Sequence, residues 1–273
     1  MLQTLVLAAA LNFGPAQTGL SLTNVRVTFG GQFGPNRPHH RYLPGDLFYL
    51  VFDVQGLRAD PQGRVEYSIG MLVKDSAGKV VLDKSKADPM IALLPFGASK
   101  MPARAYLGIG SEMRGTHTCT MIVTDRKTNE SKTFEQNFEV LPMDFGIVGF
   151  RMTYEVEGNL EGPYAPFQSV CGQVPIVHFA TVGFARDPAT RQPNNTVEVR
   201  IFDESGKPTV EQPQPFVIKQ GAREDAPGLD WHLPLPLTRE GTFTVEIKAA
   251  DTLTGKSYKM GFKVKVVLPD VKG

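Results

Sequence analysis

The sequence contains few cysteines and no excess of charge. It has 2 cysteines in 273 residues, too few for a framework of disulfides. Its 29 Lys and Arg residues nearly balance 28 Asp and Glu residues, and no basic stripe is interleaved with aromatic residues. Nucleic acid is therefore not an expected partner, because binding it needs clustered cations.

No stretch of the chain is apolar over the roughly 20 residues that a membrane-spanning helix needs. The segment Leu2 to Leu11 is apolar apart from Gln3 and Thr4, and small residues follow at Gly14 to Ala16. We interpret residues 1–18 as a candidate signal peptide, although no Lys or Arg precedes the apolar run. An N-terminal strand or a disordered leader is the alternative. A signal peptide predicts a secreted, periplasmic or cell-envelope protein that is peripheral to a membrane at most.

Motifs for catalysis, cofactors and metals are missing. The chain has neither a Gly-x-Ser-x-Gly elbow nor a phosphate-binding Gly-x-x-x-x-Gly-Lys-Ser/Thr loop. The acidic pairs at 203–204 and 224–225 lie in expected turns, whereas glycosidase carboxylates face each other across a cleft. We expect no catalytic residue, no cofactor and no metal site. Calcium at a domain joint would need more carboxylates than Asp144 alone.

What the sequence does contain is one hairpin pattern that occurs twice, at residues 115–141 and 241–267. Side chains alternate in both copies, which is typical of a half-buried strand. The expected inward residues are His117, Cys119, Met121 and Val123 in the first copy, and Phe243, Val245, Ile247 and Ala249 in the second. The turns carry Asn129 and Gly255, residues that accept a positive φ.

Other segments repeat at nearly the same offset, about 126 residues. Residues 150–154 match 25–29, residues 171–174 match 44–47, and residues 203–207 match 75–79. Short strands without an amphipathic helix indicate an all-β fold. We therefore expect a signal peptide at 1–18, a β-sandwich domain at 20–142, a second at 145–268 and a tail at 269–273, with Phe145 at a fixed joint.

The hairpin segment Gly241 to Asp251 resembles the penultimate strand of bacterial immunoglobulin-like and fibronectin-type modules. The resemblance implies two tandem immunoglobulin-like antiparallel β-sandwiches, which mostly serve in adhesion, spacing or ligand binding. Many such domains place a Tyr early in this strand. Here His117 and Phe243 take that place. The layout also resembles uncharacterised secreted bacterial proteins, which supply no activity to carry over.

The long loops after the first strand of each repeat are the candidate binding elements. Loops longer than about 12–15 residues are uncommon and often functional. Aromatic side chains on them could stack on a sugar or contact a partner. The alternative is that the rings fold back and close the end of each sandwich. The candidate ligand or partner-binding residues are Phe33, Arg37, His39, His40, Tyr42, Tyr164 and Phe167.

Several further residues invite a chemical role, and each has a simpler structural interpretation. Cys119 is expected to be a small buried apolar residue, and Cys171 a possible surface thiol. His178 and His232 fall on the face opposite the apolar residues of their strands, and the sequence shows no partner for either. Pro234 and Pro236 predict an edge strand, because proline cannot donate to a β-ladder.

These observations predict a non-enzymatic secreted binding, adhesion or spacer protein of the bacterial cell envelope. Its partner would be a protein or a cell-surface carbohydrate. One alternative is an inhibitor or accessory subunit of an envelope enzyme that acts through the long loops. The remaining alternative is a hydrolase or a metal-binding protein.

Overall fold

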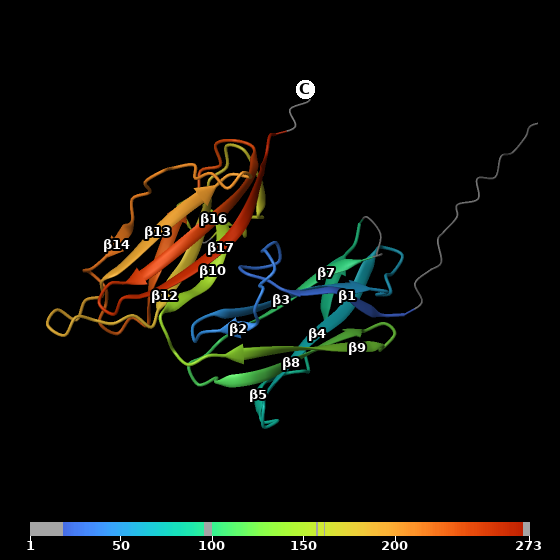
Figure 1. Cartoon of the computed structure of the whole chain (residues 1–273). Helices are drawn as coiled ribbons and strands as arrows, with labels where there is room; N and C mark the ends of the chain where they lie inside the picture. Colours follow the sequence, from blue (N-terminus) through green and yellow to red (C-terminus); the bar gives the residue numbers. More distant parts are fainter. Residues whose placement is uncertain (1–18, 96–99, 157, 161, 270–273) are drawn as a thin grey trace, which may run out of the picture.

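The computed structural model describes residues 19–95, 100–156, 158–160 and 162–269. The candidate signal peptide lies outside these residues. All regular structure in the described part is β-strand, which confirms the all-β prediction. No helix among the described residues is long and apolar enough to cross a membrane. Figure 1 shows the strands in two groups, blue to green and yellow to red.

The first half of the chain, defined here as residues 19–142, contributes two sheets to one hydrophobic cluster. Alternation of apolar and polar residues produces these strands, because each sheet buries one face. The three-stranded sheet has the order β1-β3-β7, from Ser21–Val27, Leu47–Gln55 and Met101–Gly108. The larger sheet has the order β2-β9-β8-β4-β5, from Arg41–Tyr42, Ser131–Val140, Gly115–Asp125, Arg64–Asp75 and Val80–Lys84, with β6 (Met90–Leu93) also on β4.

The second half, residues 145–269, has its own cluster and the same path of strands. Its three-stranded sheet has the order β10-β12-β15, from Gly146–Tyr154, Pro175–Val182 and Gly228–Pro234. Its five-stranded sheet has the order β11-β17-β16-β13-β14, from Gln168–Val170, Lys256–Val267, Gly241–Asp251, Asn195–Phe202 and Phe216–Ile218. In both halves the first strand carries a bulge, with Asn24 (φ 51) in β1 and Gly149 (φ 63) in β10.

The paired hairpins have the predicted inward faces. His117, Cys119, Met121 and Val123 are at most 2 % exposed, as are Val245, Ile247 and Ala249, while Phe243 is partly buried. His117 Nδ1 lies 3.0 Å from the Gly115 carbonyl oxygen, and its ring stacks on Phe138. Asn129 and Gly255 have the expected positive φ, at 59° and 72°.

Two features differ from the sequence prediction. The sheets are not purely antiparallel, because β2 pairs with β9 and β11 pairs with β17 in parallel. These strands are only two and three residues long, so no alternation could reveal them. The edge prediction for Pro234 is confirmed, since β15 pairs only with β12, but Pro236 lies beyond the end of that strand.

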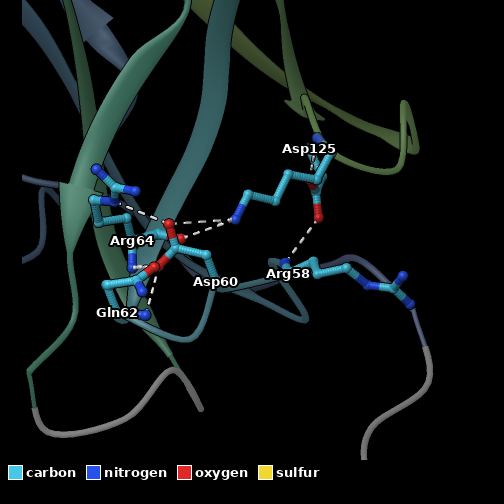
Figure 2. A network of polar contacts seen from close by, with 6 residues as sticks. Arg58, Asp60, Gln62, Arg64 and Asp125 are labelled. Atoms are coloured by element: carbon cyan, nitrogen blue, oxygen red, sulfur yellow. Dashed lines mark hydrogen bonds and ion pairs between the residues drawn. The ribbon is translucent and has the colours of Figure 1, made fainter.

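Buried carboxylates hold the loops of both halves at the hairpin turns. Asp125 Oδ2 accepts the Arg58 amide at 2.8 Å, and Asp60 accepts the amides of Gln62 and Arg64 (Figure 2). These Arg64 hydrogen bonds lower the pKa of Asp60. In the second half Asp251 Oδ2 accepts the Ala185 amide at 2.9 Å. The loops are therefore fixed by the sheet that carries the hairpin.

Candidate functional site at the joint between the halves

Asp46 links the two halves through its two carboxylate oxygens. Oδ2 accepts a hydrogen bond from Arg37 Nη2 at 2.6 Å, in an ion pair whose side chains are only 9 % and 6 % exposed. Oδ1 accepts the Gly149 amide of the second half at 3.1 Å. Charge-assisted hydrogen bonds of this kind are short and directional. Asp46 therefore fixes the position of β10 relative to the start of β3.

Arg37 is held on all sides within the first half. Its guanidinium lies 4.7 Å from the Phe29 ring centroid and 4.0 Å from that of Tyr42, and Nη2 also donates to the Arg41 carbonyl at 2.8 Å. A guanidinium that is stacked on two rings and paired with a carboxylate has little capacity left for a ligand. The role of this candidate residue in the structure is to orient Asp46.

The loop after β1 also approaches the second half directly through its backbone. Gly30 forms a parallel bridge with Arg151, and Phe29 packs edge-on against Phe150 with ring centroids 6.0 Å apart. A Cβ at Gly30 would lie 2.6 Å from the Arg151 Cα, and the φ of 61° also disfavours a side chain. Only glycine fits this contact.

An apolar patch completes the joint. Leu43, Val148 and Val182 form a separate buried cluster, with Leu141 and Ala180 packed against it. Phe145, which the sequence suggested for the joint, instead lies in the core of the second half, where it is 5 % exposed. Phe145 directly precedes β10, and its ring packs in the core of the second half.

The candidate aromatic residues divide between the cores and the surface. Tyr42 is 1 % exposed in the first core, where burial raises its pKa, and Phe167 is 9 % exposed in the second core, against Phe150 and Phe262. Both rings close the end of a core, which was the alternative to ligand binding.

The other candidates are more accessible. Phe33 is 57 % exposed near the tip of the first loop, and His39 is exposed. His40 Nδ1 lies 2.8 Å from Gln136 Nε2. Tyr164 lies against the first half, edge-on to Tyr49 with centroids 6.5 Å apart. The structure thus brings Arg37 and Tyr42 together, and it places Tyr164 at the joint, apart from them.

An open groove of about 520 Å³ lies at the joint and is lined by both halves. Its floor is apolar, with Met143, Val148, Ala180 and Val182. Its rim carries Ser111, Asp230 and the ion pair of Arg223 with Asp225 at 2.7 Å. An apolar centre with a polar rim is the usual anatomy of a binding interface. Pockets of 300 to about 1,000 Å³ between domains commonly hold ligands.

A pair of histidines lies on the same sheet as this groove. His178 is 1 % exposed, and its Nδ1 lies 2.8 Å from Nδ1 of His232, while its Nε2 lies 2.7 Å from the Thr153 hydroxyl. The Thr153 hydroxyl also contacts the Leu160 carbonyl at 2.7 Å. The sequence analysis found no partner for either histidine, because finding one needs the register of β12 against β15.

The side chains around the groove can bind a ligand or a partner. The described part of the chain has no group of three or more His, Cys, Asp or Glu side chains that could hold a metal. Burial raises the pKa of Cys119 to about 12, so this thiol is not activated as a nucleophile. The groove offers apolar area and hydrogen-bonding groups at its rim.

Comparison with known proteins adds no relative from which a role could be transferred. No protein-family model matches the chain, and a search of curated proteins finds no match.

Proposed function

We propose that the chain is a secreted, non-enzymatic binding protein made of two tandem immunoglobulin-like β-sandwiches. The equal strand order of the halves and the repeated sequence segments support a duplication. The apolar segment at Leu2 to Leu11 supports secretion, to the periplasm or the cell envelope. N-terminal sequencing of protein from the native host tests secretion, and an intact Met1 would contradict it.

The groove at the joint is the proposed binding site for a protein or a cell-surface carbohydrate. The observation that carries this proposal is the fixed joint: Asp46 contacts Arg37 and the Gly149 amide together. A groove built by two halves keeps its shape only if the halves are held in one orientation. A preformed site loses less conformational entropy on binding than a mobile one.

Affinity capture from envelope fractions with the full chain tests this proposal. Met143 lines the groove and is 47 % exposed, so Met143→Glu should abolish capture of the partner. Met90, on β6 of the first half, is 40 % exposed and provides a matched control as Met90→Glu. Equal capture by wild type and Met143→Glu would refute the groove as the site.

A second candidate function is inhibition of, or association with, an envelope enzyme through the first long loop. The exposed Phe33 favours it, because a ring that is 57 % exposed on a loop can insert into a partner. In that case Phe33→Ser should abolish capture and Met143→Glu should not. The two variants therefore separate the two functions.

A further inference from the structure

The second half contains an apolar cavity between its two sheets. The cavity measures about 310 Å³ and reaches core-facing residues of both sheets, among them Val177, Leu233 and Ile247. A smaller pocket of about 110 Å³ adjoins it and shares Ile201 and Thr209 in its lining. Neither pocket shares a lining residue with the groove at the joint.

Prolines explain why the cavity is open. In the first half the turn at 75–79 leads into β5, and Leu82 of β5 packs against the first core. In the second half the equivalent turn, where Asp203 accepts the Lys207 amide at 3.0 Å, leads into a segment with Pro208, Pro213 and Pro215. Residues 203–215 form no strand, only the isolated bridge of Pro208 with Phe202, and the prolines at 213 and 215 cannot donate to a longer ladder. In the first half β5 extends the larger sheet beside the end of β4. At the equivalent edge of the second half, beside the end of β13, there is only a loop.

The charged residues that line the two pockets are both arginines, Arg200 and Arg239. Arg200 pairs with Glu198, and Arg239 Nη2 lies 3.9 Å from Asp203 Oδ2. Both arginine side chains are at least half exposed, at 51 % and 60 %. Arg200 alternates with the core-facing Val199 and Ile201, so its side chain lies on the outer face of the sheet, whereas Arg239 lines the smaller pocket. The exposed ion pair of Arg239 contributes little free energy, so this guanidinium can turn to an incoming anion. The mouth therefore favours a negative group on the ligand.

The size of the cavity limits the apolar part of that ligand. A cavity of about 150 Å³ lined by aliphatic and aromatic side chains holds one benzene molecule. The cavity here has roughly twice that volume and is bounded by apolar side chains from β12, β13, β15 and β16. Exposed apolar residues at its entrance, Val210 and Phe216, can cover a chain that enters.

We propose that the second half binds a single alkyl carboxylate of medium chain length. The alkyl chain enters between the sheets beneath the proline-containing segment, and the carboxylate lies at Arg239. Burial of the chain drives binding, since it removes apolar surface from water. The site is separate from the proposed partner-binding groove and does not depend on it.

Isothermal titration of the full chain with sodium decanoate tests the proposal. Wild type should bind one decanoate per chain, and decyltrimethylammonium, which has the same chain with a cationic head, should bind at least tenfold more weakly. Thr209→Trp should weaken decanoate binding at least tenfold by filling the mouth, because Thr209 is exposed and lines both pockets. The Thr209 amide, which donates to the Ile201 carbonyl, is unaffected by the change.

Matched variants keep the result interpretable. Thr133→Trp adds the same ring at an exposed position of β9 and should bind decanoate like wild type. Arg239→Gln should weaken decanoate but not decanol, whereas Arg200→Gln, on the outer face of β13, should change neither. Absence of saturable decanoate binding by wild type would overturn the proposal, as would equal binding by Thr209→Trp. Equal binding of the cationic amphiphile would overturn the carboxylate assignment.

Discussion

The two halves place different ring pairs on the corresponding face of their three-stranded sheets, two residues apart along the central strand. In the first half Tyr49 of β3 is opposite Tyr106 of β7, and in the second half His178 of β12 is opposite His232 of β15. In each pair the ring on the central strand is buried and the ring on the edge strand is exposed. The pairs share a face and equivalent strands but not a residue position, because Arg26 is opposite Val51 in the first half and Arg151 is opposite His178 in the second.

The difference between the pairs lies in what covers the buried ring. The tyrosines stack at 5.9 Å with an interplanar angle of 13°, and Tyr164 of the second half packs edge-on against Tyr49. Burial raises the pKa of Tyr49. The histidines lie edge to face at 4.9 Å and are joined by a hydrogen bond, with Thr153 of the same half as a further partner. The tyrosine pair contributes to the contact between the halves through Tyr164. The histidine pair holds a loop of its own half through Thr153, whose hydroxyl donates to the Leu160 carbonyl.

The largest expected effect tests whether the halves depend equally on their buried turn carboxylates. Asp125→Ala and Asp251→Ala each remove an acceptor of several hydrogen bonds at a site at most 1 % exposed. Buried amides are then left without a partner, so each variant should lose about 3 kcal/mol of unfolding free energy in urea. The Asn variants keep one acceptor oxygen and should lose less. If only one of the two Ala variants lost unfolding free energy, the two halves would not depend equally on these carboxylates.

A smaller effect separates the ring pairs. His178→Leu removes the hydrogen bonds to Thr153 and His232 in a buried setting, so urea unfolding should show a loss of about 2 kcal/mol. Tyr106→Leu removes a stacked ring that is 66 % exposed, and about 0.5 kcal/mol should be lost. Equal losses would mean that the hydrogen bonds of the histidines contribute no more than exposed stacking.

Acid should weaken one loop of each half in parallel. Hydrogen bonds from Arg64 lower the pKa of Asp60, and those from Thr190 lower the pKa of Asp187. A carboxyl whose pKa is lower in the folded chain stabilises that chain above its usual pKa, about 3.9, and the contribution is lost as the pH falls through the folded value. Both carboxylates are partly exposed to solvent, so the effect should be small. Amide chemical shifts of Arg64 and Thr190 should change together on acidification, and a change at one alone would contradict the parallel.

The two halves can also be compared by the reactivity of their cysteines, which does not require a change in stability. Burial raises the pKa of Cys119 to about 12, while Cys171 is only partly buried, and both are free. At pH 8 a thiol reagent should modify one cysteine in the native chain and two in denaturant. Cys171→Ser should abolish the native reaction. Modification of Cys119 in the native chain would show that the first core opens readily.

The sequence predicted those parts of the fold that depend on a pattern of neighbouring residues. The inward faces of β8 and β16 and the positive φ of Asn129 and Gly255 depend on neighbours along the chain, so alternation and turn chemistry reveal them. The parallel strand β2 depends on a distant partner, β9, and leaves no local pattern.

The candidate site was less predictable for the same reason. The sequence singled out the loops as unusual, but in the structure Arg37 contacts Asp46 and two rings. The partnership of His178 with His232 needs the register of two strands far apart in sequence. The proline segment at 208–215 was visible in the sequence, yet a cavity beneath it follows only from the packing of the sheets.

The proline at the end of β15 has a consequence for self-association. β15 is an edge strand, and an unpaired edge can accept a strand from another chain. Pro234 offers no amide hydrogen, so a foreign strand that extends along this edge loses a rung at its last residue. The edge beside the groove is thereby protected against the runaway strand addition that leads to fibrils.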